Sequence, residues 1–226
     1  MIKAVLFDMG GTLITSCSPQ EILQIYDRIL RAHGIKRSLD EIAAAKEKAD
    51  ERFDIRQLVD FGRNFWIEYN RLLVEELGVK EREARVLAET IDREWWSYAD
   101  VELHPDVLPV LNELKAKKVK LGLISNGLES DIEYVMRKVG LEGFFDVEVG
   151  ADTFRSMKPD KEIFLRTLEK LGVSAGEALF VGDSLENDYK GAENAGIKAL
   201  LIDRKNVVGD CQVEKIRSLW ELLRLV

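Results

Sequence analysis

The chain has 226 residues and a formal net charge of −8, with 46% hydrophobic and 33% charged residues. This length allows one α/β domain with a smaller insert, and the composition is that of a folded globular protein rather than a disordered one. The negative charge opposes general affinity for nucleic acids or anionic membranes, so we predict neither as a partner.

We expect neither a targeting segment nor a site built from cysteines. Residues 1–8 have only a short apolar run that ends in an aspartate, so we expect no signal peptide or membrane span and a cytoplasmic location. The two cysteines, Cys17 and Cys211, lack the spacing of a zinc site or a redox pair. We interpret them as unrelated thiols.

Short apolar segments that end in polar or glycine residues predict buried parallel strands. Helical periodicity occurs between and after them, and this alternation predicts an α/β fold with a parallel sheet covered by helices on both faces. The expected strands are 2–7, 119–125, 145–149, 178–181 and 197–202, and the expected helices are 107–117, 128–139, 161–171, 188–195 and 213–223.

The stretch from about residue 19 to residue 98 breaks the alternation, because it contains no convincing strand. Amphipathic patterns predict helices over 19–33, 39–52, 61–77 and 81–96. We therefore expect an inserted all-α cap domain over 17–98, between the first and second strands. The core domain would then comprise 1–16 and 99–226.

Binding crevices in open parallel sheets lie outside the carboxyl ends of the strands. In this chain, three of the predicted strands end in residues suited to chemistry, and a lysine precedes a predicted helix between two of them. Carboxylates there could act as nucleophile or metal ligands, and glycines let a ligand approach the backbone closely. The candidates are Asp8, Gly10, Gly11, Thr12, Ser125, Asn126, Lys158, Asp183, Asn187 and Asp188.

These segments, in this order, resemble the four motifs of the haloacid dehalogenase-like hydrolase superfamily, from residue 2 to about residue 203. The resemblance implies a Rossmann-like core, with the helical insert as a cap of the first type. It makes Asp8 the nucleophile, Ser125 the second motif and Lys158 the third. Asp183 and Asp188 correspond to the acidic loop of the fourth motif.

The phosphatase branch of this superfamily implies Mg²⁺-dependent hydrolysis of a small phosphate monoester, through a phospho-aspartyl intermediate on Asp8. The metal ligands would be Asp8, Asp183 and the backbone carbonyl of Gly10. Asp188 would orient metal-bound waters or pair with Lys158, with Asn187 and Thr12 as further supporting residues. The residues that would bind the phosphoryl oxygens are Ser125, Asn126, Gly11 and Lys158.

One position departs from the commonest phosphatase pattern, which has a second aspartate two residues after the nucleophile. Gly10 stands there instead. Positioned acid–base catalysis contributes about 10²–10⁴-fold in rate, so slow turnover is expected. Three substitutes remain open: a carboxylate of the insert such as Asp54, Asp60 or Glu68, a metal-bound water, or a leaving group that needs little protonation.

Gly10 also resembles branches of the superfamily with other chemistry, namely 2-haloacid dehalogenases and phosphonatases. The Ser125-Asn126-Gly127 turn suits a dehalogenase, whereas Asp183 and Asp188 would repel a carboxylate substrate, and Phe164 replaces the tyrosine that dehalogenases carry. A phosphonatase needs a cap lysine, for which Lys36 and Lys46 are candidates.

A non-catalytic protein that binds a phosphorylated metabolite is a further alternative, with Gly10 as the sign of lost catalysis. Against it, several buried polar groups would cost desolvation without a use. Both a monomer and a homodimer are compatible with the sequence.

Overall fold

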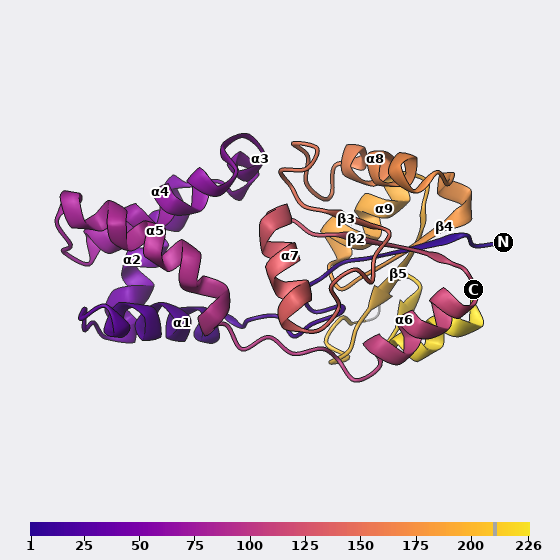
Figure 1. Ribbon diagram of the computed structural model, residues 1–226, viewed down its shortest axis with the longest axis horizontal. Coiled ribbons are helices and arrows are strands. Elements are labelled where there is room, and N and C mark those ends of the chain that lie inside the picture. The colour runs from indigo at the N-terminus through magenta and orange to yellow at the C-terminus, as the bar shows by residue number, and fades with distance from the viewer. Residues whose placement is uncertain (210–211) are drawn as a thin grey trace. The chain divides into compact units, whose positions relative to one another are not determined.

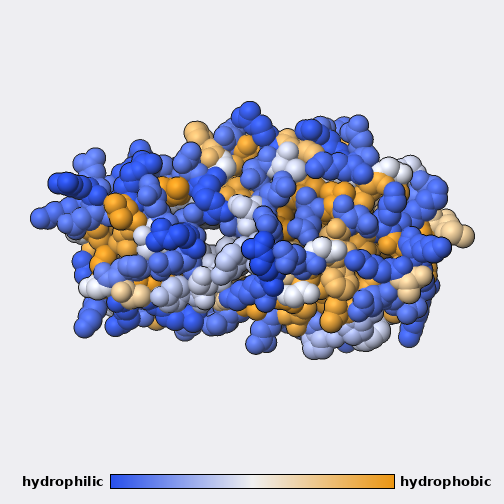
Figure 2. Space-filling view, in the orientation of Figure 1, coloured by the Kyte–Doolittle hydropathy of each residue, from blue (hydrophilic) through white to orange (hydrophobic). Residues whose placement is uncertain are grey.

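The computed structural model describes residues 1–209 and 212–226, so Cys211 lies outside the described residues. The chain forms two compact units, one made of 1–16 and 101–226 and the other of 17–100 (Figure 1). On the face shown in Figure 2, hydrophilic side chains cover most of each unit, and smaller patches of hydrophobic residues are visible among these hydrophilic side chains. None of the described helices has the length and apolar character that crossing a membrane requires.

The first unit contains a six-stranded sheet in the order β3-β2-β1-β4-β5-β6, with every pairing parallel. β1 is flanked by β2 on one side and β4 on the other, so the strand order reverses there. The strands are β1 (Ala4–Phe7), β2 (Lys120–Ile124), β3 (Val147–Val149), β4 (Ala178–Gly182), β5 (Lys198–Ile202) and β6 (Lys215–Ile216).

Helices cover both faces of this sheet, with α6 on one side and α8 and α9 on the other (Figure 1). The arrangement is the predicted Rossmann-like α/β core. The helical segments of this unit are α6 (Val107–Ala116), α7 (Glu129–Lys138), α8 (Lys161–Leu171) and α9 (Gly191–Asn194), the 3₁₀ helices Ala175–Glu177 and Leu219–Arg224, and the π-helix Leu185–Lys190.

The position of β1 in the core explains why its sequence is a continuous apolar run. All four of its residues are fully buried, because the strand is central and both of its faces are covered. On the face covered by α8, Leu6 packs in one cluster with Phe164 and Phe180. The two phenylalanine rings meet edge to face, with their centroids 5.2 Å apart.

The second unit is built from helices: α1 (Pro19–Ala32), α2 (Leu39–Arg52), α3 (Leu58–Phe61), α4 (Arg63–Glu76) and α5 (Glu81–Tyr98), with a 3₁₀ helix, Ile55–Gln57. Ser18 and Ser38 begin α1 and α2 with capping boxes, in which each serine side chain accepts from the amide of a glutamate three residues later. Inside the unit, the hydroxyl of Tyr26 donates to Oδ1 of Asn70 at 2.8 Å.

Three predicted helices differ from the structure. The helix expected over 61–77 begins only after Gly62, which has φ +53° and separates α3 from α4. The helix expected over 188–195 is a π-helix followed by the short α9. The closing helix expected over 213–223 is wrong, because Lys215–Ile216 pairs with β5 as a sixth strand and the extended Ser218 then starts a 3₁₀ helix.

Phe164 provides a test of the core. We expect Phe164→Ala to lower the free energy of unfolding by about 3–5 kcal/mol, because it removes a fully buried ring and leaves a cavity beside Phe180. The control is Leu165→Ala on the same helix, where 39% of the residue is exposed, and its expected loss is under about 1 kcal/mol. Urea unfolding measures both, and equal losses would contradict this account of the core.

Candidate active site

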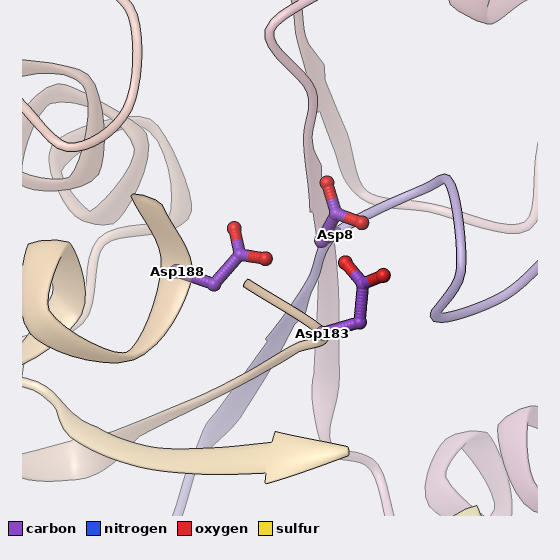
Figure 3. Close-up of side chains that lie close together, drawn as sticks. All are labelled: Asp8, Asp183 and Asp188. Atoms are coloured by element: carbon purple, nitrogen blue, oxygen red, sulfur yellow. The ribbon is translucent and has the colours of Figure 1, made fainter. Parts of the chain in front are cut away.

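The candidate site lies at the carboxyl ends of β1 and β4, where three predicted carboxylates converge. Asp8 directly follows β1, Asp183 follows β4, and Asp188 comes from the π-helix after β4. One carboxylate oxygen from each lies within 4.8 Å of the others, and Figure 3 shows the three side chains gathered in one place. Asp8 and Asp188 are buried, whereas Asp183 is exposed.

Lys158 joins two of these carboxylates. Its Nζ donates to Oδ1 of Asp8 and to Oδ1 of Asp188, each at 2.6 Å, and its side chain is only 2% exposed. Burial by itself lowers the pKa of Lys158, but the charges of Asp188 and Asp8 outweigh it and raise the pKa above its usual value. The ammonium group is therefore a permanent positive charge beside Asp8.

The electrostatics of the cluster favour a cation. Burial raises the pKa of Asp8 to about 7, against the opposing charge of Lys158, and the neighbouring carboxylates of Asp188 and Asp183 add to the rise. Although Asp183 is exposed, the protein around its carboxyl group partly desolvates it, and this desolvation and the charge of Asp188 also raise its pKa. Three carboxylates face one ammonium group, so the cluster has excess negative charge. Oxygen donors in this number and spacing fit a hard divalent cation such as Mg²⁺.

Gly11 allows the loop after β1 to approach Asp183. Its φ of +76° favours glycine, and a Cβ at this position would lie 2.1 Å from Oδ2 of Asp183. At Gly10, by contrast, a Cβ would meet nothing within 4 Å. The second glycine of the pair is therefore required by geometry, and the first has open space around it.

Asn126 holds the backbone of Lys158 with both ends of its side chain. Its Nδ2 donates to the carbonyl oxygen of Lys158 at 2.9 Å, and its Oδ1 accepts from the amide of Lys158 at 2.7 Å. The side chain thus positions the lysine, while the backbone amide remains the part predicted to bind phosphoryl oxygens. Ser125, which directly follows β2, is buried, and its hydroxyl accepts from the amide of Gly127 at 3.1 Å.

The remaining candidates have different surroundings. Asp188 is fixed further because its Oδ2 accepts from the amide of Ser184 at 2.9 Å. Asn187 is exposed, and its amide donates to the Ser184 hydroxyl at 3.1 Å. Thr12 is fully buried, and within the described residues its hydroxyl has no hydrogen-bond partner. Its carbonyl accepts from Arg204, a residue for which the sequence offered no signal.

The carboxylates proposed as substitutes for the missing acid belong to the helical unit. There, Asp54 forms an ion pair with Arg56, and Glu68 forms one with Arg71. Asp60 lies in α3.

The sequence matches the haloacid dehalogenase-like hydrolases over residues 2–196, so the chain belongs to this family and is a hydrolase. It is 28% identical over 236 residues to the glyceraldehyde 3-phosphate phosphatase of Methanopyrus kandleri, an alignment that covers 99% of this chain and 98% of the relative.

Solved structures agree on the fold. A HAD phosphatase from Thermococcus onnurineus is 29% identical with a TM-score of 0.70, over 99% of this chain and 97% of that one. A 2-haloacid dehalogenase from Pseudomonas syringae is 24% identical with a TM-score of 0.78, over 100% and 98% of the two chains. The second likeness concerns the fold alone, so overall shape does not separate phosphatase from dehalogenase chemistry.

The two glycines give a matched test of the proposed cation site. We expect Gly11→Ala to weaken Mg²⁺ binding by about 10–100-fold, because the new methyl group displaces the carboxylate of Asp183. Gly10→Ala should bind Mg²⁺ as the wild type does, since its methyl group enters open space. Isothermal titration calorimetry measures both, with thermal unfolding to check that each variant folds. Equal affinities in the two variants would contradict the role given to Gly11.

Proposed function

We propose that this hydrolase is a Mg²⁺-dependent phosphatase that acts on a small phosphorylated metabolite in the cytoplasm. The observation that carries the proposal is the convergence of Asp8, Asp183 and Asp188 around the buried ammonium group of Lys158. The phosphatase relative from Methanopyrus kandleri supports the same class of substrate, a small phosphate monoester. The helical unit would act as the cap, and the sheet-containing unit as the catalytic core.

Asp8 is the proposed nucleophile. One of its carboxylate oxygens attacks phosphorus, the ester bond to the leaving oxygen breaks, and that oxygen takes a proton from water as the alcohol departs. Water then hydrolyses the phospho-aspartyl group, which returns Asp8 and releases inorganic phosphate. A phosphate dianion repels a carboxylate, so this attack requires positive charge around the phosphoryl group.

Lys158 supplies part of that charge from a fixed position, because Asn126 holds its backbone and Asp188 holds its ammonium group. Mg²⁺, held by Asp8, Asp183 and the carbonyl of Gly10, would supply further positive charge where negative charge develops. Ser125 and the backbone amide of Asn126 would donate hydrogen bonds to the phosphoryl oxygens. The amide of Gly11, which the sequence also suggested for this role, instead donates to the carbonyl of Ile14 at 2.7 Å. We assign Thr12 and Asn187 supporting roles around this set.

Three alternatives are weaker on physical grounds. A dehalogenase would bind a carboxylate substrate, and Asp183 and Asp188 beside Asp8 would repel it. A phosphonatase would need a lysine from the helical unit. The candidates Lys36 and Lys46 lie in no decisive motif, and Lys46 forms an ion pair with Asp50. A protein that only binds its ligand would have no use for a buried ammonium group in contact with two carboxylates, whose desolvation is costly.

Hydrolysis of p-nitrophenyl phosphate tests the proposal directly. We expect phosphate release that requires Mg²⁺ and stops when the metal is chelated. Asp8→Asn should lower kcat/KM by at least about 10⁴-fold, because it removes the nucleophile. The parallel assay is chloride release from 2-chloropropionate. Halide release without metal would overturn the phosphatase proposal in favour of a dehalogenase, and activity that survives Asp8→Asn would remove Asp8 as the nucleophile.

The glycine at position 10 allows a second test, which concerns protonation of the leaving group. We expect Gly10→Asp to raise kcat on an alkyl phosphate by about 10²-fold, because the new carboxyl group can protonate the departing alkoxide. The gain on p-nitrophenyl phosphate should be much smaller, since p-nitrophenolate leaves without a proton. Gly10→Asn is the matched control, with the same shape and no acidic proton. An equal gain in both variants would exclude acid catalysis as the cause.

A further inference from the structure

Arg204 reaches the loop that carries Asp8 from a different strand. It lies shortly after β5, and two of its guanidinium nitrogens donate to one carbonyl oxygen, that of Thr12: Nε at 3.2 Å and Nη2 at 2.7 Å. Its side chain is 16% exposed. The guanidinium group is planar and rigid, so two of its nitrogens that donate to the same carbonyl oxygen fix the direction of that carbonyl. A single donor on a flexible side chain would fix it less well.

The guanidinium group of Arg204 also binds a buried carboxylate on its side away from Thr12. Its third nitrogen, Nη1, donates to Oδ2 of Asp106 at 3.0 Å, and Asp106 is 5% exposed at the start of α6. The same carboxylate oxygen accepts from the hydroxyl of Ser218 at 2.6 Å and from the amide of Leu219 at 2.8 Å. Arg204 therefore connects the loop after β1 to a buried anchor formed by α6 and the C-terminal segment.

The loop has its own internal hydrogen bonds. The amides of Leu13 and Ile14 both donate to the carbonyl of Met9, at 2.9 and 3.1 Å, and the amide of Gly11 donates to the carbonyl of Ile14 at 2.7 Å. These three hydrogen bonds join residues 9–14 into one closed turn. A hold on Thr12 is therefore transmitted to the residues at its other end, which follow Asp8 directly.

We propose that Arg204 is a positioning residue for the reaction: by holding the carbonyl of Thr12 it fixes the orientation of the loop and, with it, the carboxylate of Asp8 and the carbonyl of Gly10. The inference rests on the proposed function, in which Asp8 attacks phosphorus. Displacement of a reacting group by about 1 Å can cost about 10²-fold in rate. Loss of the contact between Arg204 and Thr12 would therefore slow catalysis by letting Asp8 shift, although Arg204 lies outside the cluster of Asp8, Asp183 and Asp188.

Three variants separate positioning from stability. Arg204→Gln removes the fork, and Arg204→Lys keeps the charge but offers a single point donor. Ser218→Ala removes a hydrogen bond to Asp106 and the cap on Trp220. Asp106 keeps its contacts with Arg204 and with the amide of Leu219, and the hydrogen bonds from Arg204 to Thr12 stay in place. Ser218→Ala therefore controls for any loss of stability at the same buried anchor.

Two readouts apply to all three proteins. We expect Arg204→Gln to lower kcat for p-nitrophenyl phosphate by about 10²-fold with little change in KM, and Arg204→Lys to lie between it and the wild type. Amide hydrogen exchange in residues 9–14 should accelerate in both Arg204 variants, because Leu13 and Ile14 lose the support of their turn. Ser218→Ala should lower thermal stability with kcat and exchange in this segment unchanged.

The outcomes are distinct. Unchanged exchange in Arg204→Gln, or accelerated exchange with an unchanged kcat, overturns the positioning role. A kcat in Ser218→Ala as low as in Arg204→Gln also overturns it, because the effect would then follow stability alone. If the wild type hydrolyses no phosphate ester, the proposed function fails on its own, and the exchange comparison still decides whether Arg204 holds the loop.

Discussion

The contact on which the site depends is the buried ammonium group of Lys158 between Asp8 and Asp188. Without it, the three carboxylates at the ends of β1 and β4 would repel one another in a poorly solvated place, and Asp8 would favour its protonated form. With it, Asp8 retains a partner that stabilises its charge, although the cluster as a whole stays negative. The same contact therefore lowers the cost of burying these groups and leaves a net negative charge that a divalent cation would neutralise.

The sheet topology brings these groups together. β1 has its two neighbours, β2 and β4, from parts of the chain more than 100 residues further on, and all three run in the same direction. Their carboxyl ends therefore meet at one edge, where Asp8, Ser125 and Asp183 follow the strands. Gly11 allows the first loop to lie against Asp183, and Asn126 holds the segment that carries Lys158. Each chemical group is thus placed by a strand end or by a direct contact with one.

Much of this arrangement was predictable, because buried parallel strands and the polar residues after them are local patterns. The family match over 2–196 confirms the resemblance found in those residues. What the sequence did not reveal depends on distant contacts. β6 is only two residues long and exists because it pairs with β5, so the helix expected over 213–223 was wrong. Asn126 binds the backbone of Lys158, and Arg204 binds the carbonyl of Thr12. These contacts join segments far apart in the chain, so no periodic pattern in the sequence indicates them.

The insertion of the helical unit after residue 16 has a consequence for biosynthesis. The ribosome produces β1 first and then the whole of 17–100, before either neighbour of β1 is made. All residues of the helical unit are present once residue 100 has emerged, so this unit can fold at that stage. The apolar β1 strand, by contrast, must wait without a partner until residues 120–124 and 178–182 follow. During that interval the nascent chain presents an unpaired hydrophobic strand, which is the kind of segment that molecular chaperones shield.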